Sequence, residues 1–91
     1  MFYVISYDIV DDTRRNRVSE ALLDYGQRVH YSVFECSLEE ELAKKMVARL
    51  KDIINTAEDR VRIYPLCANC RRHLQWFGTE GLPEERKVVI I

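Results

Sequence analysis

Hydrophobic side chains occupy both alternating faces of the first ten residues. One face carries Tyr3, Ile5, Tyr7 and Ile9, and the other carries Phe2, Val4, Ser6, Asp8 and Val10. Alternation with a period of two predicts a β-strand, and two apolar faces predict a strand that is covered on both sides. The chain is therefore expected to begin with a central strand that ends near a single acidic residue.

Two amphipathic helices are predicted after this strand. Asp11 or Asp12 is a suitable N-cap for the first, and Gly26 is expected to end it; its buried stripe is Val18, Ala21, Leu22 and Tyr25. "SLEE" at 37–40 fits a capping box for the second, with Ser37 and Glu40 three residues apart. The expected stripe of that helix is Leu42, Met46, Leu50 and Ile53, with Val47 and Ile54 beside it.

The remaining segments are rich in strand-forming residues. "RVHYSVFEC" at 28–36 is either one long strand or two short strands folded back around Tyr31 and Ser32. Further strands are predicted at 60–66, 74–77 and 87–91, and the turn-rich segment "GTEGLPEE" connects the last two. If 27–37 form a tight hairpin, the chain is an α+β protein with the ferredoxin-like order βαββαβ, an antiparallel sheet and both helices on one face.

That arrangement leaves the second face of the sheet uncovered. Because the first strand is apolar on both faces, a second copy of the chain is the simplest cover, and we expect a homodimer. Residues 1–78 are then a ferredoxin-like domain. Residues 79–91 are a connector and an extra C-terminal strand that packs on the partner subunit, which would protect the apolar "VVII".

Charge and cysteine content limit the function classes. A net charge of −1 argues against a protein that coats nucleic acid by bulk charge, so any such binding must come from local clusters. The basic residues are ten arginines and four lysines, and arginine suits bidentate binding of phosphate. Three cysteines, no apolar run of about 20 residues and no signal-like start favour a cytoplasmic protein without a membrane span.

Asp8 is the first candidate for chemistry. It shares a face with Phe2 and Val4, and a two-fold axis would bring two copies of its carboxylate together, where a divalent cation such as Mg²⁺ would offset their repulsion. The alternative is an acid that leaves the sheet at an exposed strand end and caps nearby backbone.

Arginines follow closely in "YDIVDDTRRNR" at 7–17. Arg14 lies over the predicted buried stripe, and Arg15 and Arg17 flank it. They either pair with Asp11 and Asp12 or hold a phosphate beside the end of the strand.

"CANC" at 67–70, with His73, has metal-like spacing but provides three ligands where a structural zinc site needs four. Reduced thiols of minor structural importance are the expectation. Thioredoxin-like chemistry is less favoured still, because the sequence does not predict a strand, a CxxC and a helix in succession.

Taken together, "YDI" at 7–9, the arginine-rich helix start, "YGQRVHYSVFE" at 25–35 and "RIYPL" at 62–66 resemble CRISPR-associated protein two, the small nuclease-like protein of the CRISPR spacer-acquisition module. One departure is His30, where the family usually carries Gln. The resemblance implies a ferredoxin-like homodimer whose last strand packs on the partner.

The resemblance also implies site residues. Asp8 would be catalytic and would bind Mg²⁺ or Mn²⁺ for phosphodiester hydrolysis of single-stranded RNA or double-stranded DNA. The implied substrate-binding residues are Arg15, Arg17, Arg28 and Phe34, with Tyr7 and Ser32 nearby. The alternative is a non-catalytic homodimer that bridges DNA for the CRISPR integrase. A toxin-like ribonuclease or an RNA-binding module is a third interpretation.

Overall fold

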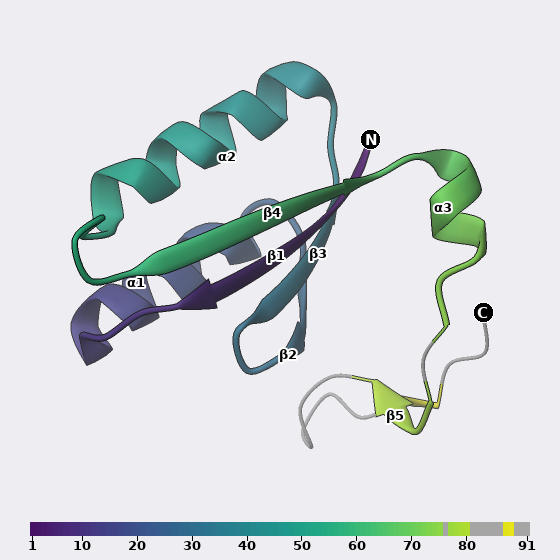
Figure 1. Cartoon of the computed structure of the whole chain (residues 1–91), viewed down its shortest axis with the longest axis horizontal. Coiled ribbons are helices and arrows are strands. Elements are labelled where there is room, and N and C mark those ends of the chain that lie inside the picture. The colour runs from purple at the N-terminus through teal and green to yellow at the C-terminus, as the bar shows by residue number, and fades with distance from the viewer. Residues whose placement is uncertain (76, 81–86, 89–91) are drawn as a thin grey trace.

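The computed structural model describes residues 1–75, 77–80 and 87–88. The order of its elements is the ferredoxin-like order, followed by a short helix and two short strands (Figure 1). The elements are β1 Phe2–Asp8, α1 Asp12–Leu23, β2 Gln27–His30, β3 Val33–Ser37, α2 Glu40–Ile53, β4 Arg60–Leu66, α3 Ala68–Arg72, β5 Thr79–Glu80 and β6 Lys87–Val88.

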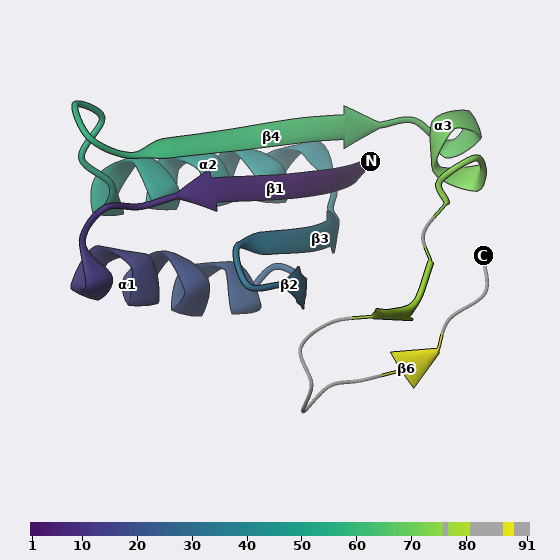
Figure 2. The same ribbon diagram turned by 60° about the horizontal axis from the view of Figure 1, so that its bottom comes forward.

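Two layers make up the main body. The strands form one antiparallel sheet in the order β2-β3-β1-β4, and α1 and α2 lie together on one of its faces (Figures 1 and 2). The predicted α+β fold with both helices on one face is confirmed. None of the helices in the described part of the chain is long and apolar enough to cross a membrane.

The core lies between the helices and the sheet. Ile5 and Tyr7 of β1 and Ile9, which follows the strand, are buried there, as the alternation predicts. In register with Ile5 are Phe34 of β3 and Ile63 of β4, so the helix-facing side of the sheet is apolar across three strands. Burial of these side chains is the main force that holds the helices on this face.

The hairpin between β2 and β3 is tight, with Tyr31 and Ser32 at its turn, so the alternative of one long strand at 28–36 is wrong. Gly26, which precedes β2, has a role different from the predicted one. Helix α1 ends at Leu23 and Gly26 does not adopt a left-handed conformation. A Cβ at Gly26 would lie 2.2 Å from the carbonyl oxygen of Glu35, so glycine is needed because β3 passes so closely.

Helix α2 begins later than a capping box would require. Ser37 is the last residue of β3, and the N-cap is Glu39, whose side chain makes no capping hydrogen bond. The buried stripe is confirmed at Met46 and Leu50. Leu42 is instead exposed, and Ala43 takes the buried position in the first turn, because the helix packs its small residue against the sheet.

The chain after β4 departs most from expectation. Residues 74, 75 and 77 lie outside any strand, so the strand predicted at 74–77 is wrong for these positions, and Trp76 lies outside the described residues. Cys67 instead caps α3, which follows β4 directly. The predicted last strand is found as β6, which pairs with β5 away from the main sheet; residues 89–91 lie outside the described part of the chain (Figure 2).

Candidate functional site

Asp8 stands at the end of β1 on the sheet face that the helices leave open. It is exposed, and its Cα lies in register with that of Arg60 on β4. Among the described residues, none forms a hydrogen bond or ion pair with the Asp8 carboxylate. The carboxylate is therefore available to a ligand that approaches the open face.

The neighbouring strand adds two cations to this end of the face. Arg60 lies opposite Asp8, and Arg62 lies opposite Ser6. Both arginines are exposed, and the Nη1 of Arg62 donates to the hydroxyl of Tyr64 at 3.4 Å. The sequence analysis did not single out these two arginines. The alternation in "RVRIY" could have placed them on one face, but their register with Asp8 depends on strand pairing.

The turn between β2 and β3 closes the same end of the sheet. The backbone N–H of Tyr7 donates to the carbonyl of Ser32 at 3.1 Å, and the buried Tyr7 hydroxyl donates to the carbonyl of Tyr31 at 3.2 Å. Tyr7 therefore fixes the turn through its backbone and its buried hydroxyl, and Ser32 takes part through its backbone carbonyl. The exposed ring of Tyr31 meets that of His30 edge-on at 5.7 Å between centroids, a stacking surface that sequence reasoning missed.

Arg15 comes to the link between β1 and α1. Its Nη1 pairs with Asp12 at 2.7 Å, which confirms the expected local ion pair, and its Nη2 donates to the carbonyl of Ile9 at 3.1 Å. The side chain keeps 44% of its surface exposed. Arg15 thus contacts the backbone of the residue that follows Asp8, and its exposed guanidinium can donate further hydrogen bonds to a ligand.

Arg14 has a different environment. Its Nε lies 2.9 Å from Asp59 Oδ2, and its Nη2 lies 2.9 Å from Glu58 Oε2. Asp59 also accepts from the backbone N–H groups of Val10 and Asn55. These donors, Arg14 foremost, lower the pKa of Asp59 to about 2 although its burial opposes this. The guanidinium of Arg14 therefore stabilises the fold through these ion pairs.

The other predicted substrate-binding residues lie on the helix side of the sheet. Arg17 lines a groove between α1 and α2 together with Arg49 and Asp52. Arg28 donates to the hydroxyl of Ser19 on α1 and lies over the ring of Phe34 at 5.5 Å. Phe34 is completely buried, so the structure does not bring these side chains together with Asp8.

The donors at Asp8 limit the metal that this site can take. Within residues 1–75, 77–80 and 87–88, no group of three or more His, Cys, Asp or Glu side chains is placed to hold a metal ion. A hard cation such as Mg²⁺ or Mn²⁺ fits a single carboxylate, because water and phosphate oxygens can complete its shell. Among the described residues, one chain therefore offers a single carboxylate to such a cation here.

Comparison with known proteins gives a consistent picture. The family model described as CRISPR associated protein Cas2 matches residues 1–74. A relative named CRISPR-associated endoribonuclease Cas2 1, from Chloroflexus aurantiacus, is 45% identical over 92 residues, which cover 100% of this chain and 99% of the relative. A second, CRISPR-associated endonuclease Cas2 2 from Thermus thermophilus, is 38% identical over 89 residues, 98% of this chain and 94% of the relative.

Solved structures are similar as well. The crystal structure of a hypothetical protein from Thermus thermophilus matches with a TM-score of 0.78 at 37% identity and covers 90% of this chain and 95% of that chain. The crystal structure of Streptococcus pyogenes Cas2 matches with a TM-score of 0.76 at 34% identity and covers 86% of this chain and 100% of that chain. The similarity thus extends over the whole ferredoxin-like body.

Proposed function

This chain belongs to the CRISPR-associated Cas2 family, and from that premise we propose that it is a metal-dependent endonuclease of a CRISPR system. The reaction is hydrolysis of phosphodiester bonds in single-stranded RNA, double-stranded DNA or both. The names of the relatives, endoribonuclease and endonuclease, support a nuclease role. The observation that carries the proposal is the exposed Asp8 carboxylate beside Arg60 on the open sheet face.

Each residue at this end has a distinct task. Asp8 would hold Mg²⁺ or Mn²⁺, which when bound lowers the pKa of a water molecule and stabilises charge on the phosphate. Arg60 and Arg62 would bind phosphate groups on either side of the scissile bond, since both project from alternate positions of the same strand. Tyr31 would offer its exposed ring to an unstacked base.

A homodimer would complete the site. Among its charged residues the open face carries the apolar side chains of Val4 and Val33 and the ring of Tyr64, 45% of whose surface is exposed. A second copy on this face would cover these side chains and bring a second Asp8 to the cation. The proposal includes packing of the C-terminal strand on the partner subunit, a cytoplasmic location and action with the CRISPR integrase during spacer acquisition.

A non-catalytic adaptor is the second candidate. It is favoured by the same exposed arginines together with the incomplete metal donor set of one chain. Duplex phosphates can be bound without hydrolysis by Arg15, Arg60 and Arg62, because phosphate contacts position a protein on DNA irrespective of sequence. In this role the dimer bridges DNA for the integrase, and Asp8 is dispensable.

The test compares the wild type with Asp8→Asn. Labelled single-stranded RNA and double-stranded DNA are incubated with each protein in Mg²⁺, Mn²⁺ or EDTA. Asp52→Asn is the matched control, because it removes one exposed carboxylate from the helix side of the molecule. We expect metal-dependent cleavage by the wild type and the control. The cleavage rate of Asp8→Asn should be at least about a hundredfold lower, the usual effect of removing a group that stabilises charge in the transition state.

The adaptor makes the opposite prediction. If no protein cleaves either nucleic acid, while the wild type and Asp8→Asn bind duplex DNA equally, the adaptor is correct and the nuclease is not. Sedimentation of both variants as the wild-type species would show that the comparison is between equally folded proteins. Arg60→Gln and Arg62→Gln should weaken DNA binding under either function.

A further inference from the structure

Cys67 and Cys70 form a close thiol pair at the junction of β4 and α3. Cys67 is the N-cap residue, and its Sγ accepts a hydrogen bond from the backbone N–H of Cys70 at 3.4 Å. Both cysteines are exposed and free. A disulfide needs Cβ atoms about 3.5–4.5 Å apart, closer than the about 5–6 Å of residues three apart on a helix, so closing one here requires a backbone adjustment at the extended cap residue Cys67.

This arrangement corrects the expectation drawn from the sequence. Strand β4 ends at Leu66, Cys67 follows directly, and α3 begins at Ala68, so a strand, a CxxC and a helix do occur in succession. The prediction of a strand at 74–77 obscured this, because it left no room for a helix after the cysteines. The two thiols therefore have a defined geometry rather than a place in an irregular loop.

The two thiols are also chemically different. Hydrogen bonds from the backbone N–H and thiol of Cys70 lower the pKa of Cys67, and donation to Cys67 raises the pKa of Cys70. The third cysteine, Cys36, is buried in the core, where desolvation raises its pKa to about 11. Cys67 is thus the thiol most readily ionised, and Cys36 is an unreactive internal reference.

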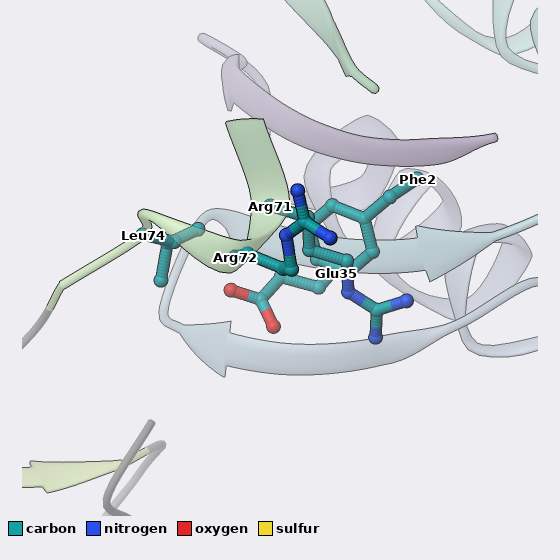
Figure 3. Close-up of a pocket in the computed structure, with 5 residues that line it drawn as sticks. All are labelled: Phe2, Glu35, Arg71, Arg72 and Leu74. Carbon is teal, nitrogen blue, oxygen red and sulfur yellow. The ribbon is translucent and has the colours of Figure 1, made fainter. Parts of the chain in front are cut away.

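Cys67 is one of the residues that line a cavity at the N-terminal end of β1. The cavity has a volume of about 530 Å³ and is lined by Cys67, Phe2, Ser37, Arg71 and Arg72, among others. Arg71 lies over the ring of Phe2 at 4.3 Å, and the Arg72 Nη2 donates to Asn69. Figure 3 shows the side chains of Arg71, Arg72 and Glu35 gathered beside that ring in the adjoining cavity of about 330 Å³.

We propose that Cys67 and Cys70 are a redox-active dithiol that exchanges with a low-molecular-weight disulfide bearing carboxylate groups. The cavity provides space for such a molecule beside Cys67, and the two arginines that line it favour an anion over a neutral or cationic disulfide. The proposal does not depend on the nuclease function, because the dithiol lies at the opposite end of β1 from Asp8.

The exchange proceeds in two balanced steps. The Cys67 thiolate attacks one sulfur of the small disulfide, whose S–S bond breaks, and one small thiolate leaves and takes up a proton. The Cys70 thiol then loses its proton to solvent, and its sulfur attacks Cys67 Sγ and releases the second small thiolate. Two protein thiols become one disulfide, and one small disulfide becomes two thiols.

The experiment treats the purified full-length protein with oxidised glutathione. We expect the number of titratable thiols to fall from three to one, with Cys36 remaining, and the mass to fall by two hydrogen atoms. Cys70→Ser should accumulate a glutathione adduct on Cys67. Cys67→Ser should form its adduct at least about tenfold more slowly, because Cys70 is the less ionised thiol.

Contrary results are equally clear. Equal adduct rates in the two variants, three thiols that persist in the wild type, or stoichiometric zinc that protects both cysteines would each overturn the proposal. Because Cys67 and Cys70 are exposed, the serine variants should fold, and far-UV circular dichroism would verify this.

The recognition of an anion is tested separately. Arg72→Gln should slow oxidation by glutathione disulfide about threefold and leave oxidation by uncharged hydroxyethyl disulfide unchanged. Lys45→Gln, which removes an exposed cation from α2, is the matched control and should alter neither rate. A similar slowing of both disulfides by Arg72→Gln would contradict the anionic substrate.

Discussion

The Nε of Arg14 lies 2.9 Å from the carboxylate of Asp59, whose side chain has no exposed surface. The pair joins the first turn of α1 to the residue before β4, 45 positions away in the chain. Val10 and Asn55 donate their backbone N–H groups to the same carboxylate. This arrangement fixes the end of the sheet at which Asp8 and Arg60 face each other.

The ion pair predicts a loss of stability in acid. The pKa of Asp59 is about 2 in the folded protein and is taken as 3.8 in the unfolded chain. Its stabilising contribution is therefore complete above the unfolded value and is lost as the pH falls through the folded value, between roughly pH 5 and pH 2. Urea unfolding of the wild type at several pH values should show the midpoint falling across this range.

Asp59→Asn tests whether the Asp59 carboxylate causes this loss of stability in acid. The variant should be less stable than the wild type at pH 7, and the difference between them should shrink as the pH falls toward 2, because the wild type loses the charge that the variant lacks. Glu58→Gln is the matched control, since half of the Glu58 side chain is exposed and a surface ion pair contributes little. A stability difference between wild type and Asp59→Asn that stays constant with pH would show that Asp59 is not the group responsible.

Two neighbouring arginines should have separable effects. Arg14→Gln is expected to lower the unfolding midpoint clearly, because it leaves the buried Asp59 carboxylate without its main partner. Arg15→Gln should change the free energy of unfolding by no more than about 0.5 kcal/mol, since its ion pair with Asp12 is exposed.

Nucleic-acid binding distinguishes the same two variants. Arg15→Gln should weaken binding and reduce the slope of log K against log salt by about one, the effect of one lost phosphate contact. Arg14→Gln should leave that slope unchanged at temperatures where it is folded. A reduced slope in Arg14→Gln would show that this guanidinium also reaches phosphate.

Gly26→Ala should destabilise the protein by about 1–3 kcal/mol, as other overpacked sites do. The new Cβ would lie 2.2 Å from the Glu35 carbonyl oxygen and 2.5 Å from Cys36 Sγ. Chemical denaturation would measure the loss. The double variant Gly26→Ala with Cys36→Ala should not recover the stability of Cys36→Ala alone, because the backbone contact with Glu35 remains.

Variants of Phe34 test whether this residue contacts nucleic acid directly or affects binding only by stabilising the core. Phe34→Ala should cost about 3–5 kcal/mol, because the ring is fully buried beneath the helices. Phe34→Leu should cost about 1 kcal/mol and leave the protein folded. If Phe34→Leu binds nucleic acid with wild-type affinity in a gel-shift titration, the residue acts through the core; a large loss of affinity would indicate a direct contact.

Local patterns in the sequence determined the order and type of the main elements. Alternation placed Ile5 and Tyr7 on the buried face of β1, and the 3.6-residue period identified Val18 and Leu22 as the buried side of α1. These features depend on residues that are close in the chain, so a short window contains the information. The same local pattern predicted that Asp8 could be an exposed acid at the end of a strand.

Tertiary structure decided the features that join distant segments. The pairing of Asp8 with Arg60, the ion pair of Arg14 with Asp59 and the contact of Gly26 with Glu35 each depend on register or packing between separate elements. A one-residue change in strand register would reverse every side chain on a strand, which no local pattern reveals. The sequence therefore supplied the candidate residues, and the packing of strands and helices decided which of them face the open sheet together.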